Sequence, residues 1–273
     1  MQQHFEEQQE KQSEELVESL KVGEKPMVAM MQQLFRRYLD VKGSLFSALK
    51  NYQASFFYWA LMESKVHPQI IDKVGEINKD LNVLTKIDLD KKGALENFSN
   101  KKPQTMPTRF FHVTSEDIIK NLQVKGEATW TLPLNANQFV GNDRVRLTTV
   151  RVWLEGAKPE KEGQMISIDI STSGNYRDRL NGKEYLFTSK PLSRGFQYEI
   201  ISDTQGHYFQ FDDKTHGRIL TDGKVDDIVS FAYFKPTPFT EWTIKIDEKK
   251  NTGLDLTKLT KITMEFAGST VYN

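Results

Sequence analysis

The chain has 273 residues and a mass of 31.6 kDa, and its 37 basic and 37 acidic residues give a net charge of zero. This balance provides no overall field to attract nucleic acid or an anionic membrane, so nonspecific nucleic-acid binding is not expected. The absence of cysteine excludes disulfides, thiolate metal ligands and a cysteine nucleophile.

Targeting signals are not visible in the sequence. Residues 1–21 are rich in Glu and Gln and lack the basic start and apolar run of a secretory signal. The longest apolar run, residues 54–62, is shorter than the roughly 20 residues that span a bilayer. The compartment stays open between the cytoplasm and release by a non-classical route, and membrane contact is expected only in an oligomer.

The front third of the chain carries a heptad pattern. Apolar residues recur at alternating spacings of four and three, which predicts one long helix over residues 26–64. The acidic run before this helix is interpreted as a solvated arm. The apolar seam of the helix consists of Met27, Met31, Leu34, Tyr38, Val41, Leu45, Ala48, Tyr52 and Trp59.

A second helix is expected after His67-Pro68, because the residue before a proline avoids the helical region and proline suits a first turn. Its seam begins at Ile70, and the helix ends near Phe98. Two such helices joined by a short turn predict an antiparallel, coiled-coil-like hairpin over residues 1–98, with an additional N-terminal helix.

Four consecutive aromatic residues, Phe56, Phe57, Tyr58 and Trp59, surround the first helix with rings. Burial on more than one side of the helix is therefore expected. Packing against the second helix and the β half, or an interface between subunits, explains this band better than contact with lipid. We predict an interface at these four residues.

The second half of the chain has the pattern of a β protein. Residues 99–113 contain prolines and lysines without periodicity and are expected to be a linker. After a short helix capped near Ser115, the apolar period changes to two at Gly126. Nine short strands with turn signals between them predict an antiparallel β-sandwich or jelly roll over residues 114–273. The expected fold class is therefore α+β.

One strand changes phase within its length. In residues 145–154 the apolar alternation slips by one position at Thr148-Thr149. A β-bulge at this point would turn both halves of the strand toward the core. Without it, Arg146 or Arg151 would point inward, at a high desolvation cost unless paired.

A second informative segment, residues 231–246, is rich in aromatic residues. Pro236 and Pro238 cannot donate to a β-ladder, so a corner is expected there. The residues that follow alternate, and this pattern directs Trp242, Ile244 and Ile246 toward the core.

From residue 144 onward, the order of features resembles the end of the large A-type subunits of bacterial toxin complexes. The shared features are a basic residue before a valine-rich strand, a second short strand, a Pro-Phe element with a Trp strand, and a last strand entered through a Leu/Asp turn. They occupy residues 144–154, 166–170, 238–244 and 254–262.

The resemblance covers residues 139–269 and implies a β-sandwich that follows the long helices of a pore-forming channel. In that family this region docks a partner cocoon subunit. The present sequence departs from the family where a glycine-rich element is shortened to Thr240-Glu241. It also lacks the large shell and receptor-binding regions.

No motif of a nucleophilic, nucleotide-binding or zinc-protease site occurs, so no catalytic residue and no cofactor are predicted. Two groups of polar residues are interpreted as surface residues, and no metal site is expected. A glycan-active carboxylate pair in the second group is disfavoured, because adjacent strand residues face opposite ways. The groups are His207 and His216 with Asp203, Asp212 and Asp213, and Asp222 with Asp226 and Asp227.

The strongest binding candidate is the segment 174–182, which is interpreted as a loop. Its residues Tyr176, Arg177, Asp178 and Arg179 combine an amphipathic ring with forked donors, a composition favoured at binding hot spots and sugar sites. A hairpin loop with internal Arg/Asp pairing is the alternative interpretation.

Together these observations favour a non-enzymatic binding or assembly module. Its helical hairpin would associate with itself or dock a protein partner, as in the partner-docking tail of a toxin-complex pore-forming subunit. The alternative is a carbohydrate-binding, lectin-like sandwich that uses the helices as an oligomerisation stalk and takes a glycan as its ligand.

Overall fold

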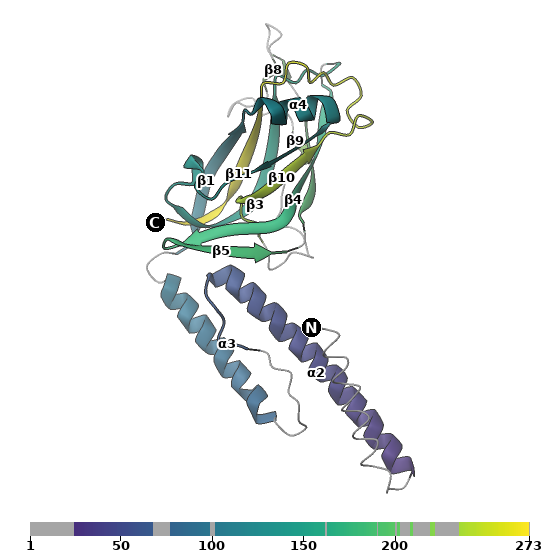
Figure 1. The fold of residues 1–273 in the computed structure, drawn as a ribbon, viewed down its shortest axis with the longest axis vertical. Helices are drawn as coiled ribbons and strands as arrows, with labels where there is room; N and C mark the ends of the chain where they lie inside the picture. Colours follow the sequence, from purple (N-terminus) through teal and green to yellow (C-terminus); the bar gives the residue numbers. More distant parts are fainter. Residues whose placement is uncertain are drawn as a thin grey trace. The chain divides into compact units, whose positions relative to one another are not determined.

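A computed structural model describes residues 25–67, 77–98, 102–161, 163–189, 191–199, 201–202, 208–209, 219–221 and 235–272 (Figure 1). The chain divides into two compact units, Met1–Ser99 and Asn100–Asn273. The first contains helices and the second contains antiparallel sheets, so the protein is of mixed helix and antiparallel β-sheet type. The expected N-terminal helix lies outside the described residues.

The helical unit contains α2 (Lys25–Ala60) and α3 (Ile77–Phe98). The heptad pattern predicted a long first helix, and α2 covers most of the predicted range. The last helical hydrogen bond joins the Leu61 N–H to the Phe57 carbonyl at 2.9 Å. Leu61 then adopts a positive φ of 51°, which ends the helix.

The two helices run in the same direction where they touch. The Tyr52 hydroxyl donates to the Asp90 carboxylate at 3.2 Å, and one to two turns further along, Phe56 and Ala60 pack against Ala94. Residue numbers thus rise together along both helices, and the chain after α2 turns back beside them (Figure 1). This differs from the expected antiparallel hairpin, and the described residues that follow α2, 61–67, are partly buried.

The β unit contains three antiparallel sheets within its described residues. The first has the order β1-β11-β3, the second has the order β2-β10-β4-β6-β9 with β5 paired to β4, and the third pairs β7 with β8. The elements are β1 (Gln104–Val113), α4 (Glu116–Lys125), β2 (Glu127–Thr131), η1 (Asn137–Phe139), β3 (Asn142–Glu155), β4 (Met165–Leu180), β5 (Lys183–Thr188), β6 (Ser193–Glu199), β7 (Ile201–Ser202), β8 (Tyr208–Phe209), β9 (Ile219–Thr221), β10 (Thr240–Lys245) and β11 (Lys261–Tyr272).

Strand β1 occupies residues that the sequence pattern assigns to a linker, so the predicted linker 99–113 is too long. β1 pairs with β11 and ends with Val113 opposite Ile262. Pro107 hid the strand in the sequence, because proline donates no ladder hydrogen bond. The register shifts around Pro107, and this irregularity accommodates the missing donor.

Residues from the two larger sheets meet in one hydrophobic core. The ring centroid of Phe266 on β11 lies 5.7 Å from the ring centroid of Trp242 on β10 and 6.0 Å from that of Phe139. Trp242, Ile244 and Ile246 are all buried, which confirms the alternation expected for this strand. The core therefore joins β10 and β11 across the sheets.

The bulge predicted in residues 145–154 is present in β3. Leu147 and Thr149 lie opposite neighbouring residues of β11, so Thr148 is the extra residue of the bulged strand. The apolar residues on both sides of the bulge are buried, as expected. Glycine is required opposite the bulge, because a Cβ on Gly268 would lie 2.0 Å from the Arg146 carbonyl oxygen.

The corner at Pro236 and Pro238 also has a structural role. The Leu147 N–H donates to the Pro236 carbonyl at 2.8 Å, and the Trp242 indole N–H donates to the Pro238 carbonyl at 2.8 Å. Both prolines thus contribute carbonyl acceptors to the sheet region, although neither can donate a backbone hydrogen bond.

Candidate functional site

The predicted binding segment 174–182 lies mainly in strand β4 and is not a loop. Residues 175–180 pair with β5, and only its last residues form the turn between the two strands. Gly174 was interpreted as the start of a loop, but with a φ of 85° it lets the strand continue through an irregular position. Side chains therefore alternate, with Tyr176 and Asp178 buried and Arg177 exposed.

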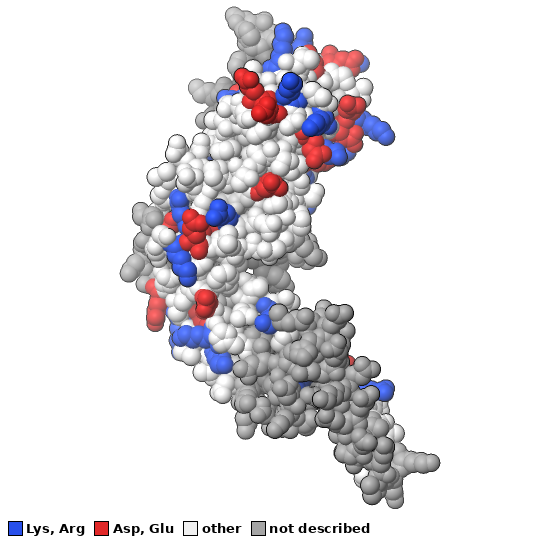
Figure 2. Space-filling view, in the orientation of Figure 1, with Lys and Arg blue, Asp and Glu red and all other residues white. Residues whose placement is uncertain are grey.

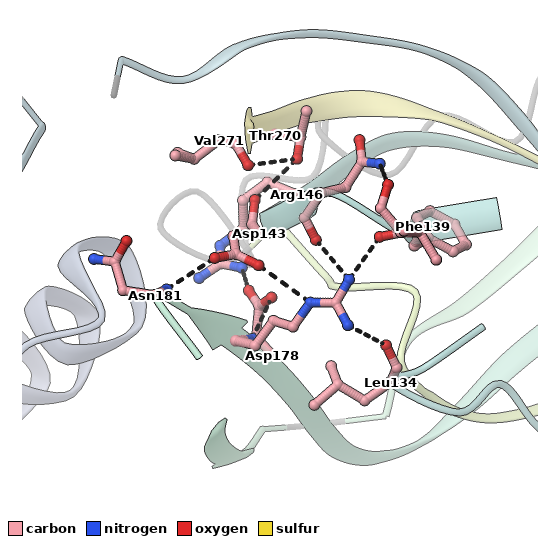
Figure 3. Close-up of polar contacts among 11 residues, drawn as sticks. Leu134, Phe139, Asp143, Arg146, Asp178, Asn181, Thr270 and Val271 are labelled. Carbon is pink, nitrogen blue, oxygen red and sulfur yellow. Dashed lines mark hydrogen bonds and ion pairs between the residues drawn. The ribbon is translucent and has the colours of Figure 1, made fainter. Parts of the chain in front are cut away.

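Asp178 is the centre of a buried ionic cluster (Figure 3). Its carboxylate forms an ion pair with Arg146, and both side chains are almost completely buried. The backbone N–H of Arg179 donates to the same carboxylate at 2.8 Å. Burial raises the pKa of Asp178, and the charge of Arg146 opposes this effect. The cluster explains how Arg146, next to the bulge, is accommodated inside the unit.

Arg179 joins this cluster to the residues before β3 and at its start. Its guanidinium lies 3.1 Å from Asp143 Oδ1 and donates to the carbonyls of Leu134 at 3.0 Å and Phe139 at 2.6 Å. A further bond reaches the Asn142 carbonyl at 3.3 Å. One side chain thus holds the segment before β3 against the end of β4.

The other two predicted ligand-binding residues have different surroundings. The Tyr176 hydroxyl shares a 2.7 Å hydrogen bond with Thr172, and burial raises the pKa of this phenol. Arg177 faces solvent and forms an exposed ion pair with Glu184 at 3.2 Å. The alternative interpretation, a hairpin loop with internal Arg/Asp pairing, is also wrong, because Asp178 and Arg179 pair with Arg146 and Asp143 outside the segment.

An imidazole, a hydroxyl and a carboxylate lie in a row across the strands β1, β11 and β3. His112 Nδ1 lies 2.9 Å from Thr263 Oγ1, which donates to Glu155 at 2.5 Å. Burial and the charge of Lys261 lower the pKa of His112. Thr263 is completely buried, so its hydroxyl holds neighbouring strands together and is closed to a substrate.

A cleft of about 510 Å³ opens beside α4. Gln123 lines it and donates to the Leu256 carbonyl at 3.0 Å. Asp255 also lines it, but its carboxylate accepts bonds from the Thr257 hydroxyl and N–H, and these bonds lower its pKa. The polar side chains that line the cleft are therefore hydrogen-bonded to residues of the loop that forms it.

The aromatic band of α2 has two surroundings. Phe56 and Tyr58 are buried, and Phe56 belongs to a small apolar cluster with Ala60 and Ala94. Phe57 is partly buried, whereas the side chain of Trp59 remains 45% exposed. The band thus packs within the unit on one side and reaches the surface on the other.

The apolar seam of α2 is largely uncovered. The exposed fractions of its side chains range from 41% to 67% at five of the six seam positions from Met27 to Leu45. The buried residues Leu39 and Leu49 lie beside this seam, and toward the end of the helix the seam residue Tyr52 packs against the cluster of Phe56, Ala60 and Ala94. The exposed seam residues are Met27, Met31, Leu34, Val41 and Leu45, and Met30 lies beside them. We call these five residues the open seam.

Asp90 of α3 provides a polar tie that the sequence did not reveal. Its buried carboxylate accepts hydrogen bonds from the Ser64 hydroxyl at 2.5 Å, the Lys65 N–H at 2.7 Å and the Tyr52 hydroxyl. Burial and the negative charge of Asp90 raise the pKa of Tyr52 to about 12. The tie fixes the segment after α2 to both helices.

Among the residues that the structure describes, no group of three acidic or histidine side chains is placed to hold a metal ion. His207 and His216 and the acidic residues near them lie outside the described residues. No described helix is long and apolar enough to cross a membrane. Figure 2 shows basic and acidic side chains intermixed on the visible face of the β unit.

The fold and its surfaces thus define a two-unit protein with a helical unit and an antiparallel β unit. No protein-family model and no curated protein matches the chain. Among solved structures it is similar to the cryo-EM structure of TcaA-TcaB from Yersinia pseudotuberculosis, with a TM-score of 0.37 and 12% identity. The match covers 93% of this chain and 14% of that one.

Proposed function

We propose that this chain is a non-enzymatic assembly module, which associates with further copies of itself through the open seam of α2. The β unit, in which the two larger sheets form the layers of a sandwich, serves as its rigid platform. In the toxin complexes that the sequence resembles, the corresponding region takes part in protein assembly, and this general role agrees with the proposal.

The open seam is the observation that carries the proposal. Its apolar side chains repeat at coiled-coil spacing, yet they stay exposed in the helical unit, whose buried cluster lies nearer the other end of α2, around Phe56, Ala60 and Ala94. Each apolar side chain that moves from water into an interface contributes about 1.5–3 kcal/mol when fully buried. A continuous exposed stripe of this kind is typical of a surface that binds another protein.

The lectin alternative is not retained. It depends on Tyr176 and Arg179 as the residues that contact a sugar. Tyr176 is buried against Thr172, and Arg179 is bound to three main-chain carbonyls and to Asp143. Neither side chain presents a surface on which a sugar ring would stack.

The test compares two double variants of α2 by light scattering after size-exclusion chromatography. We expect the natural chain to have a mass that is a multiple of 31.6 kDa. Leu34→Glu with Val41→Glu should reduce it to the monomer, because charge at the seam opposes burial. The control, Gln33→Glu with Ser47→Glu, adds the same charge at exposed positions outside the seam and should keep the assembly. A monomeric natural chain would contradict the proposal.

A further inference from the structure

The exposed methionines of the described residues gather at one place, the first turns of α2. Met27, Met30 and Met31 are 61%, 58% and 41% exposed, and we call them the methionine cluster. In the β unit, by contrast, Met106 and Met264 are almost completely buried. Methionine commonly fills gaps in a core, so a group of three in contact with solvent calls for another role.

The methionine cluster lies on one side of the helix and forms the start of the open seam. Met27 and Met31 are four residues apart and belong to the seam, and Met30 follows Met27 by three residues. Leu34 follows Met30 by four positions and Met31 by three, so the thioethers continue directly into the aliphatic part of the seam. A second copy that packs on the open seam would therefore cover these sulfur atoms.

All the sulfur of this chain is thioether sulfur, because the sequence contains eight methionines and no cysteine. A hydroperoxide such as hydrogen peroxide oxidises a thioether by two electrons and is itself reduced. The sulfur lone pair attacks one peroxide oxygen, and the S–O bond forms as the O–O bond breaks. The proton on the transferred oxygen moves to the departing hydroxide, which leaves as water. The product, methionine sulfoxide, is polar and poorly suited to an apolar contact, and methionine sulfoxide reductases reverse the change.

We infer that the methionine cluster is a reversible oxidation site, and that its oxidation by hydroperoxides weakens the self-association of this chain. The inference rests on the proposed function and adds a means of regulating it. In the free chain the exposed thioethers are open to the oxidant, whereas assembly covers them. Full burial of one methionine side chain corresponds to about a tenfold to hundredfold change in a dissociation constant. Oxidation within the cluster is therefore sufficient to separate assembled copies.

Peptide mass spectrometry after treatment of the full chain with dilute hydrogen peroxide tests the site. In the dissociated chain we expect Met27, Met30 and Met31 to be oxidised at least about tenfold faster than Met106 and Met264, because buried thioethers are shielded from the oxidant. At protein concentrations that favour assembly, the cluster should react more slowly. Equal rates at exposed and buried methionines, or cluster rates that are the same in both states, would overturn the inference.

Light scattering before and after the peroxide treatment measures the consequence for assembly. The oxidised chain should have a dissociation constant about tenfold or more higher, and methionine sulfoxide reductases with dithiothreitol should restore assembly. The triple variant Met27→Leu with Met30→Leu and Met31→Leu keeps the apolar surface but forms no sulfoxide at the cluster, so peroxide should leave its assembly unchanged.

The control variant, Met62→Leu with Met165→Leu, changes two partly buried methionines outside the cluster and should remain sensitive to peroxide. Loss of assembly by the triple variant after peroxide would overturn the inference, because the sensitivity would then come from other residues. Normal assembly of a natural chain whose cluster is oxidised would also overturn it, while leaving the proposed function intact. The proposed function itself fails separately, if the natural chain is monomeric before any oxidation.

Discussion

The two units treat their side chains in opposite ways. In the β unit, apolar residues of both larger sheets share one core, and even charged residues such as Arg146 and Asp178 are buried in pairs. In the described part of the helical unit, the buried apolar cluster consists of Phe56, Ala60 and Ala94, while the open seam faces solvent. The β unit thus buries its apolar side chains and some charged pairs internally, whereas the helical unit leaves apolar side chains of α2 exposed to solvent.

This difference shows where stability and association reside. Buried groups stabilise the folded state of the unit that contains them. Substitutions of buried residues in the β unit should therefore lower its free energy of unfolding. Exposed apolar groups contribute little to folding but much to a contact with another chain. Four substitutions test this separation, from the largest expected effect on unfolding to the smallest.

Asp178→Ala should have the largest effect. It leaves Arg146 buried beside an apolar methyl group, and loss of one member of a buried ion pair costs about 3–5 kcal/mol. The free energy of unfolding is measured with denaturant and tryptophan fluorescence, since Trp130, Trp153 and Trp242 lie in the β unit. Glu184→Ala, which removes an exposed pair, is the control and should change it little. Equal effects would show that the β unit does not depend on its buried cluster.

Asp90→Ala tests the polar tie of the helical unit. It removes the acceptor of Ser64, Lys65 and Tyr52 together, and unsatisfied buried donors cost about 1–3 kcal/mol. Thermal unfolding followed by far-ultraviolet circular dichroism should show a lower midpoint for the helical signal. Asp88→Ala removes an exposed carboxylate on the same helix and should leave that midpoint unchanged.

Tyr52→Phe should have a smaller effect at neutral pH, about 0.5–1.5 kcal/mol for one hydrogen bond. It should also change the response to alkali. The folded unit holds the Tyr52 proton more tightly than the unfolded chain, because the pKa rises from 10.0 to about 12. This contribution is fully present below pH 10 and is lost as the pH rises toward 12. The melting midpoint of the helical signal should therefore fall less in the variant over that range.

Leu34→Gln should have the smallest effect on unfolding, below about 0.5 kcal/mol, because its side chain is already exposed. The matched change Leu49→Gln, at a buried position of α2, should cost clearly more. Parallel denaturation curves of the two variants provide the comparison. If Leu34→Gln proved the more destabilising change, the open seam would be part of the folded core.

Local patterns predicted much of the β unit correctly. The phase slip at Thr148-Thr149 located a real bulge, because only an extra residue directs both halves of β3 inward. The alternation after Pro238 placed Trp242 in the core for the same reason. In each case the side-chain period of a strand carries the information, and no distant contact is needed to interpret it.

The sequence did not reveal features that depend on distant contacts. Glycine is typical of a turn, so Gly174 suggested a loop, but pairing with β5 keeps Tyr176 and Arg179 in a strand. The contacts that accompany the parallel direction of α2 and α3 include those of Asp90, whose partners lie 25 to 38 residues away. The two heptad seams contain no signal for that direction, and the exposure of the open seam became evident only from the structure.

The pairing of β1 with β11 has a mechanical consequence. Gln104, at the start of β1, lies opposite Thr270, near the end of β11, so both ends of the β unit leave the sheet side by side. A force applied to these two ends would open the ladder like a zipper, one hydrogen-bonded pair at a time. Shearing the strands would instead load all pairs together. Tension on this unit would therefore release β1 first, while the core between the sheets stays closed.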